Sequence, residues 1–294
     1  LEYVKEHSYK SGTPTMGGIA IILAMITAAL IFGKGKFVYI TLAVAFAYGV
    51  TGFLDDSIKI RYKRNLGLRP YQKIILQLSI ALIVAFVVYK NELIRGDVYI
   101  PFTKNTVSLG WGVIPLVVFI FIATTNSVNL TDGLDGLAAS TTLVYMAGIA
   151  AIIAIVSADA DKNGLSLYVK EYQGLLTVCF ATVGSLAGFL LFNCFPAKIF
   201  MGDVGSLALG GVVACVSILG RLSLYIPILG VMFATSAVSD IIQVVHYKRT
   251  KRRVFLMAPF HHHLQKKGLS ETRIGFLYST ITGIVALICV LTLI

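Results

Sequence analysis

The sequence predicts an all-α fold of the polytopic integral membrane class, a single helical bundle with about nine transmembrane helices. Of its 294 residues, 57% are hydrophobic and 13% are charged, whereas soluble domains carry about 25% charged residues. Its apolar stretches are long and lack the alternating polarity of barrel strands, which favours helices. The same composition excludes a disordered chain and a disulfide-stapled secreted module.

The predicted helices follow from the lengths of the apolar stretches. A helix needs about 20 apolar residues to cross the hydrocarbon core of a bilayer, within a range of roughly 17–25. Nine stretches meet or approach this length, although the first, third and seventh are short and must include flanking residues. They cover residues 16–32, 37–54, 74–89, 111–128, 137–157, 174–192, 205–220, 225–247 and 274–294. No soluble segment or repeat separates them, so residues 1–294 are predicted to form one transmembrane domain.

The distribution of lysine and arginine orients these helices. With residue 1 on the cytoplasmic side, 17 of the 25 basic residues fall in cytoplasmic segments, in agreement with the positive-inside rule. Membrane orientation therefore explains the net charge of +11, and nucleic acid is not expected as a partner. The predicted cytoplasmic segments after the first helix are residues 55–73, 129–136, 193–204 and 248–273.

Lys10 and the Gly- and Thr-rich segment 12–18 precede the first predicted helix. Free backbone N–H groups at a helix N-terminus, beside a lysine, can bind an anion such as phosphate. A flexible linker that ends in an ordinary helix cap explains the same residues equally well.

Two adjacent carboxylates, Asp55 and Asp56, end the second predicted helix. They oppose the helix dipole at a cost of about 0.3–1 kcal/mol each, and they repel each other, so a cation is expected beside them. Lys59 and Arg61 can supply it in a solvated ion network. The alternative is a divalent cation, or a general base whose pKa is set by such a partner.

Polar side chains recur at intervals of three residues at positions 126, 129, 132 and 135. In a helical turn Asn126, Asn129, Asp132 and Asp135 would share one face. A polar hairpin accounts for the two Asp-Gly pairs. Because no lysine or arginine lies nearby, we predict that this face binds a ligand or an ion.

The segment 193–206 contains Asn193, Phe200 and Asp203. Asp203 can cap the helix that follows it, or it can bind Mg²⁺, which takes one or two carboxylates together with phosphate oxygens. Phe200 can stack on a nucleotide base or anchor the loop in the membrane.

The last predicted cytoplasmic segment carries a basic run over residues 248–253 and three histidines at 261–263. The basic run is typical of an orientation signal that contacts anionic lipids. Adjacent histidines on a helix point in different directions, so contacts to phosphate or a nucleotide fit them at least as well as a metal site. Asp240 and Gln243 lie within the preceding span, where polar groups are functional candidates.

Carboxylates suited to Mg²⁺, several cations, helix N-termini and one aromatic ring are together typical of phosphoryl transfer. Their predicted position at the inner boundary of the bilayer indicates one water-soluble substrate and one lipid substrate.

Five motifs resemble those of the bacterial phospho-N-acetylmuramoyl-pentapeptide transferase family, within the polyprenyl-phosphate N-acetylhexosamine-1-phosphate transferase superfamily. They are GTPTMGG (12–18), DDSIK (55–59), NLTDGLDG (129–136), NCFPAKIFMGD (193–203) and APFHHHLQKKG (258–268). The resemblance extends over almost the whole chain. GTPTMGG and the histidine motif are the elements specific to the muramoyl branch.

The resemblance implies a reaction and a setting for it. UDP-N-acetylmuramoyl-pentapeptide and undecaprenyl phosphate would give lipid I and UMP, with Mg²⁺ as cofactor, in the first membrane step of peptidoglycan synthesis. The enzyme would be a homodimer in the bacterial inner membrane, surrounded by membrane lipids, with its active site facing the cytoplasm. Family members have ten spans, so the first of them is the one expected to be missing here.

The resemblance also implies roles for individual residues. Asp203 corresponds to the principal Mg²⁺ ligand, with Asp56 as a second candidate ligand. One member of the Asp55–Asp56 pair would act as base or nucleophile, and His263 is predicted to be catalytic as well. Phe200 would stack on uracil. The predicted substrate-binding residues are Lys10, Lys59, Lys73, Asn129, Asp132, Asp135, Asn193, Phe200, Gln243, His261 and His262.

Two other functions are compatible with the sequence. A sister enzyme would transfer GlcNAc-1-phosphate to the same lipid, and the choice of sugar nucleotide would distinguish it. A membrane transporter would place its charged groups near the middle of the bilayer, often in repeated halves. Here the acidic residues lie near one boundary, which favours an enzyme.

Overall fold

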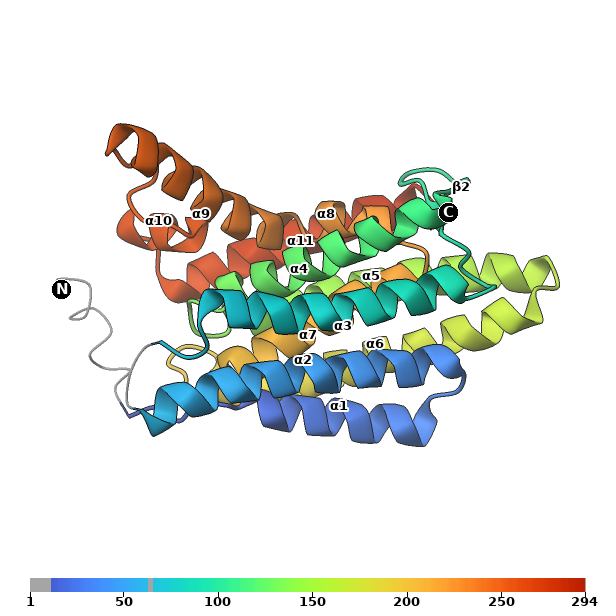
Figure 1. The fold of residues 1–294 in the computed structure, drawn as a ribbon, viewed down its shortest axis with the longest axis horizontal. Helices are drawn as coiled ribbons and strands as arrows, with labels where there is room; N and C mark the ends of the chain where they lie inside the picture. Colours follow the sequence, from blue (N-terminus) through green and yellow to red (C-terminus); the bar gives the residue numbers. More distant parts are fainter. Residues whose placement is uncertain (1–11, 63–65, 294) are drawn as a thin grey trace.

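The computed structural model describes residues 12–62 and 66–293, which form long helices lying side by side (Figure 1). The helices are α1 (Gly18–Phe32), α2 (Lys36–Arg61), α3 (Pro70–Lys90), α4 (Val113–Thr131), α5 (Leu137–Lys162), α6 (Ser166–Asn193), α7 (Gly202–Leu219), α8 (Ile226–Leu229), α9 (Val231–Thr250), α10 (Phe260–Lys266) and α11 (Glu271–Leu291), with the 3-10 turns η2 (Gly110–Gly112) and η3 (Ser223–Tyr225). A short antiparallel hairpin joins β1 (Asp97–Tyr99) to β2 (Thr106–Ser108). The predicted all-α bundle is confirmed.

The connecting segments are divided between the two ends of the bundle. The turns that precede α1, α3, α5 and α7 lie at the end where α10 is found, and the hairpin lies at the opposite end (Figure 1). Four of the segments predicted to share one side of the membrane therefore share one end of the molecule. The chain is a multi-pass membrane protein.

Two of the nine predicted spans differ from the prediction. The eighth, over residues 225–247, is bent by 77° between η3–α8 and α9. The break falls at Gly230, a residue with weak helix propensity. The first has only 15 helical residues, a length of about 22 Å at about 1.5 Å per residue, which is short for a core of about 30 Å. Seven straight helices of the described chain are long and apolar enough to cross a bilayer.

Helix α7 lies at the centre of the bundle, and most of its length is buried. It packs against α1, α2 and α4 through small residues, which let helix backbones approach closely in membranes. A Cβ atom at Gly210 would lie 2.6 Å from the Thr125 Cα, and one at Gly211 would lie 2.8 Å from the Tyr48 ring. The outer helices keep large apolar side chains such as Phe46 and Phe119 exposed, as a surface facing lipid requires.

The hairpin end of the bundle contains a buried carboxylate that caps a helix. Glu171 in α6 accepts hydrogen bonds from the Lys36 and Phe37 N–H groups, at 3.0 and 2.8 Å. These N–H groups begin α2 and have no partner within the helix. Gly35 (φ 97°) allows the close approach, because a Cβ atom there would lie 2.7 Å from Glu171 Oε2. Glu171 therefore fixes where α2 starts against α6.

Candidate active site

Three carboxylates and two lysines meet where α2, α3 and α7 come together. Lys59 Nζ lies 2.6 Å from Asp55 Oδ2, 3.3 Å from Asp56 Oδ1 and 3.1 Å from Asp203 Oδ2. Lys73 Nζ lies 2.8 Å from the same Asp203 oxygen. The structure thus brings together the carboxylates of two motifs that are nearly 150 residues apart in sequence.

The N-terminus of α7 orders this cluster. Asp56 Oδ2 accepts a hydrogen bond from the Val204 N–H at 3.1 Å, and Asp203 lies in the first turn of the helix. The positive end of the α7 dipole therefore faces carboxylates that the negative end of α2 disfavours. Gly202 (φ 73°) permits the contact, since a Cβ atom there would lie 2.6 Å from Asp56 Oδ2. The positive charge expected beside Asp55 and Asp56 therefore comes from Lys59 and from the N-terminus of α7.

The adjacent aspartates have different surroundings. Asp55 Oδ1 accepts a hydrogen bond from the Leu68 N–H at 2.8 Å, and a Cβ atom on Gly67 would lie 2.6 Å from its carboxylate. Asp55 thus holds the segment that leads into α3. Asp56 lines the cavity described below, whereas Asp55 is absent from its wall.

The acidic cluster fits a magnesium ion. Asp55, Asp56 and Asp203 each offer an oxygen within 4.8 Å of the others, and Mg²⁺ is a hard cation that prefers such ligands. The Lys59 ammonium contacts all three carboxylates, so the cluster already holds one cation at its centre.

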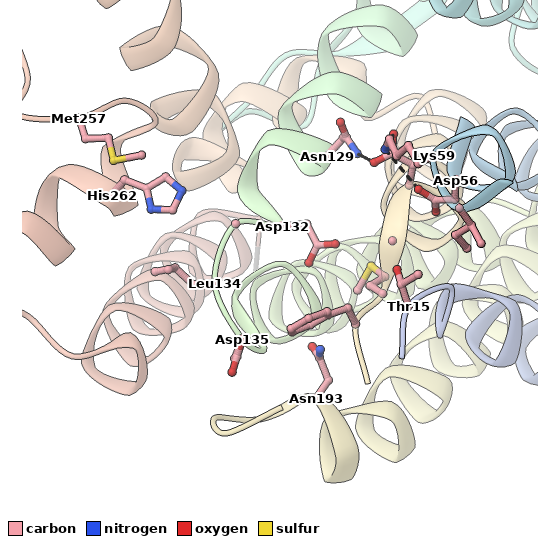
Figure 2. A pocket seen from close by; sticks show the side chains of 16 residues that line it. Thr15, Asp56, Lys59, Asn129, Asp132, Leu134, Asp135, Asn193, Met257 and His262 are labelled. Carbon is pink, nitrogen blue, oxygen red and sulfur yellow. Dashed lines mark hydrogen bonds and ion pairs between the residues drawn. The ribbon is translucent and has the colours of Figure 1, made fainter. Parts of the chain in front are cut away.

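Of the four polar residues at positions 126, 129, 132 and 135, the first two lie in α4 and the last two lie in the turn after it. Asn129 Nδ2 donates to Asp203 Oδ1 at 2.9 Å and to Ser206 Oγ at 2.8 Å. Asn126 instead donates to Gln77 Oε1 at 2.8 Å, toward α3. Because α4 ends at Thr131, the predicted helical face does not continue to positions 132 and 135. The turn that follows nevertheless directs Asp132 into the cavity (Figure 2).

The pKa of Asp132 is raised well above its usual range. Burial is the largest cause, followed by the negative charges of Asp203, Asp56 and Asp135. A raised pKa means that the folded protein binds this proton more tightly than the unfolded chain does. The contribution of protonated Asp132 to the free energy of unfolding is therefore present at low pH. It is lost as the pH rises through the pKa that Asp132 has in the folded protein.

We expect Asp132→Asn to stabilise the protein at neutral and alkaline pH, because the amide keeps the side-chain size and removes a negative charge that the neighbouring carboxylates disfavour. A gain of about 1 kcal/mol would raise the melting temperature by about 2–4 °C in a chain of this size. The difference from the unmodified protein should shrink as the pH falls and Asp132 becomes protonated. Thermal melts of detergent-purified protein between pH 5 and 9 measure this, and an equal or lower melting temperature for the variant at every pH would contradict it.

The loop before α7 is held from two directions. The Asp135 Oδ2 accepts a hydrogen bond from the Ala197 N–H at 2.9 Å, and Asn193 Nδ2 donates to the Ile199 carbonyl at 2.8 Å. The Oδ1 of Asn193 is buried and has no hydrogen-bond partner among the described residues. Phe200, half-buried in the same loop, lines the cavity with Asp135 and Asn193.

The Gly- and Thr-rich segment before α1 packs along this loop. The Gly17 and Gly18 N–H groups donate to the Phe200 and Met201 carbonyls, each at 2.9 Å, and the Phe200 N–H donates to Pro14 at 2.8 Å. These N–H groups are therefore engaged with backbone, and they are not free to form the anion site that the sequence suggested. Lys10, the lysine of that prediction, lies outside the described residues.

The three histidines of α10 face three directions. His262 lines the cavity. His261 is fully buried, and its Nε2 packs so closely on Gly133 that a Cβ atom there would lie 2.4 Å away. Burial lowers the pKa of His261 to about 3, so this ring is neutral. His263 accepts a hydrogen bond from the Leu256 N–H at 3.1 Å through Nδ1, and it is not among the residues that line the cavity.

Gln243 in α9 uses its amide to hold the following loop. Its Oε1 accepts from the Val254 and Phe255 N–H groups, each at 3.0 Å, and its Nε2 donates to the Phe255 carbonyl at 3.1 Å. Predicted to bind substrate, Gln243 instead acts on the backbone that leads to α10.

A cavity of about 590 Å³ joins these groups. In Figure 2, Asp132 lies between Thr15, Asp56 and Lys59 on one side and His262 and Met257 on the other. The lining residues are Thr15, Asp56, Lys59, Ile60, Asn129, Asp132, Gly133, Leu134, Asp135, Asn193, Phe200, Met201, Gly202, Asp203, Met257 and His262. Its size suits a nucleotide-sized ligand.

Seven lining residues were not among the predicted site residues: Thr15, Ile60, Gly133, Leu134, Met201, Gly202 and Met257. Thr15 and Gly133 belong to the motifs at 12–18 and 129–136, so the sequence predicted their segments as part of the site but not these two positions. Met257 lies just before the histidine motif, and an apolar side chain in a loop carries no signal of its own.

Comparisons with known proteins identify relatives over nearly the whole chain. Residues 37–221 match the family described as Glycosyl transferase family 4. Residues 10–22 match a pattern described as phospho-N-acetylmuramoyl-pentapeptide-transferase signature 1.

Individual relatives bear the name phospho-N-acetylmuramoyl-pentapeptide-transferase. The protein of Clostridium novyi (strain NT) is 42% identical over 292 residues, covering 99% of this chain and 86% of the relative. That of Clostridioides difficile (strain 630) is 41% identical over 97% of this chain and 85% of its own length. That of Bacillus mycoides (strain KBAB4) is 45% identical over 92% of this chain and 80% of its own length.

Proposed function

Since the chain belongs to the phospho-N-acetylmuramoyl-pentapeptide-transferase family, we propose that the cavity at the α10 end of its bundle is where the phosphosugar passes from UDP to undecaprenyl phosphate. The protein is a membrane transferase that makes lipid I, a precursor of peptidoglycan. We assign it to the bacterial inner membrane as a homodimer, with the cavity facing the cytoplasm. The positive-inside distribution of lysine and arginine supports that orientation.

The observation that carries this proposal is the carboxylate cluster around Lys59. Asp203 and Asp56 would hold Mg²⁺, with Asp55 close by. When bound, the ion would neutralise charge on the diphosphate and on the departing UMP. Lys73 holds Asp203 in place from α3, and Asn129 does so from α4.

The remaining lining residues suit the sugar nucleotide. Phe200 offers an aromatic face for the uracil ring. Asn193, whose buried Oδ1 lacks a partner among the described residues, can accept a hydrogen bond from a ligand. Asp135 and Asp132 also line the cavity. We assign these four residues to the nucleotide.

We propose a direct displacement. Asp56 takes a proton from the lipid phosphate, whose oxygen attacks the β-phosphorus of the donor. The bond from that phosphorus to the bridging oxygen breaks, and the α-phosphate leaves as UMP. In the alternative scheme an aspartate attacks first and forms a phosphosugar-enzyme intermediate. Lipid-stripped enzyme that exchanged labelled UMP into the donor without any acceptor would overturn the direct scheme.

The choice of donor tests the function itself. Purified enzyme with undecaprenyl phosphate should convert UDP-MurNAc-pentapeptide to lipid I and should leave UDP-GlcNAc unreacted when both are present. Radiolabelled donors in competition measure this. Preference for UDP-GlcNAc would instead identify the sister transferase.

We expect His262→Ala to weaken donor binding more than His263→Ala does. His262 lines the cavity, whereas His263 supports the loop at Leu256. Loss of a hydrogen bond to a charged phosphate costs about 1.5–3 kcal/mol, or roughly a 10- to 100-fold rise in Kd. Calorimetric titration of each variant with the donor measures the Kd. A larger rise in Kd for His263→Ala than for His262→Ala would contradict the proposal that His262 contacts the donor.

A further inference from the structure

Glu271 is a buried carboxylate at the start of α11 that does not line the cavity. Its Oε2 accepts a hydrogen bond from the Asp135 N–H at 3.0 Å. Asp135 lies 136 residues earlier in the chain, in the turn between α4 and α5. The final helix therefore holds a turn that borders the cavity.

The connection continues from this turn into the loop before α7. The Asp135 carboxylate accepts a hydrogen bond from the Ala197 N–H at 2.9 Å, and Ala197 lies three residues before Phe200. Glu271 thus fixes the backbone of Asp135, and the Asp135 side chain in turn fixes the backbone of the Phe200 loop. Both Asp135 and Phe200 line the cavity.

We infer that Glu271 is a positioning residue that sets the geometry of the proposed nucleotide-binding residues Asp135 and Phe200. The inference rests on the proposed function, in which Asp135 and Phe200 contact the UDP part of the donor. Correctly held side chains matter because small displacements of binding groups weaken ligand contacts. Glu271 acts through Asp135 and is not itself a catalytic residue.

A purely structural role for Glu271 makes different predictions. A carboxylate in the first turn of a helix is favoured by the helix dipole, so its removal would lower stability whatever it positions. Glu171 provides the matched control, because it is also buried and accepts backbone N–H groups, but at the hairpin end of the bundle. Removing the Glu171 carboxylate should lower the stability of the protein without changing the KM for the donor.

The experiment measures kcat, the KM for the donor and the KM for undecaprenyl phosphate in Glu271→Ala, Glu271→Gln and Glu171→Ala. We expect Glu271→Ala to raise the donor KM about tenfold, the effect of one lost hydrogen bond, with the acceptor KM unchanged. Glu271→Gln keeps an acceptor oxygen and should restore the donor KM while losing the charge. Glu171→Ala should lower the melting temperature and leave both KM values unchanged.

The possible results separate the inference from the function. If Glu271→Ala does not fold, Glu271→Asp replaces it, because the shorter side chain withdraws the carboxylate from Asp135 and should still raise the donor KM. An unchanged donor KM in the variant that folds, or the same rise in Glu171→Ala, would overturn the inference and leave the function standing. An unmodified enzyme that did not turn over UDP-MurNAc-pentapeptide would overturn both.

Discussion

Asp203→Ala is expected to abolish turnover, with a fall in kcat of at least about a thousandfold, while the protein still folds in detergent. The Asp203 carboxylate contacts Lys59 and Lys73 and accepts a hydrogen bond from Asn129. Its loss would remove the proposed principal magnesium ligand and leave Lys73 without its ion-pair partner in the cluster. Lipid I formation by purified variant at saturating Mg²⁺ measures the change.

Asp97→Ala is the control for Asp203→Ala. Asp97 forms an ion pair with Arg221 at 3.2 Å, in the hairpin at the other end of the bundle, so its removal should leave kcat near that of the unmodified enzyme. Mg²⁺ binding in the presence of nucleotide should be lost in the Asp203 variant and retained in the control. If Asp203→Ala kept a kcat within threefold of the unmodified enzyme, Asp203 would not belong to the active site.

Gly52→Ala is expected to destabilise the protein and to reduce turnover together. A Cβ atom at Gly52 would lie 2.1 Å from the Asp203 carbonyl oxygen and 2.5 Å from the Val204 nitrogen. These are backbone atoms of the first turn of α7, so relief of the clash must move α2 away from the residue that holds the cluster. Overpacking of this kind costs about 1–3 kcal/mol, and the displacement acts directly on Asp203, the proposed magnesium ligand.

Gly184 offers a matched comparison within α6. A Cβ atom there would meet no atom within 4 Å, so Gly184→Ala should stabilise the helix by up to about 1 kcal/mol and leave turnover unchanged. Thermal melts and lipid I assays on both variants measure the contrast. Equal melting temperatures for the two variants would show that α2 and α7 are not in contact at Gly52.

Much of the fold could be predicted because the bilayer imposes simple requirements. A helix must be apolar over a fixed length, and lysine and arginine mark the side on which its ends lie. The bend at Gly230 escaped prediction because residues 225–247 remain apolar on both sides of it. Only packing decides whether a glycine within such a stretch continues a helix or ends it.

The site was predictable at the level of motifs rather than of single side chains. Successive residues on a helix point about 100° apart, so which member of Asp55–Asp56 or of His261–His263 meets the cavity depends on how the helix is rotated against its neighbours. Glu271 gave no signal, because its partner at Asp135 is a backbone N–H group. Backbone groups are the same at every position, so the sequence does not reveal which of them a distant side chain will meet.

The burial of α7 has a consequence for how the protein moves. Amide protons in a helix that is enclosed by neighbours exchange with solvent only when large parts of the structure open. We therefore expect the amides of α7 beyond its first turn to be among the slowest to exchange in the described chain, and Asp203, the proposed magnesium ligand, lies at the start of this helix. The proposed phosphate-binding groups are thus attached to a segment that becomes accessible only when large parts of the bundle open.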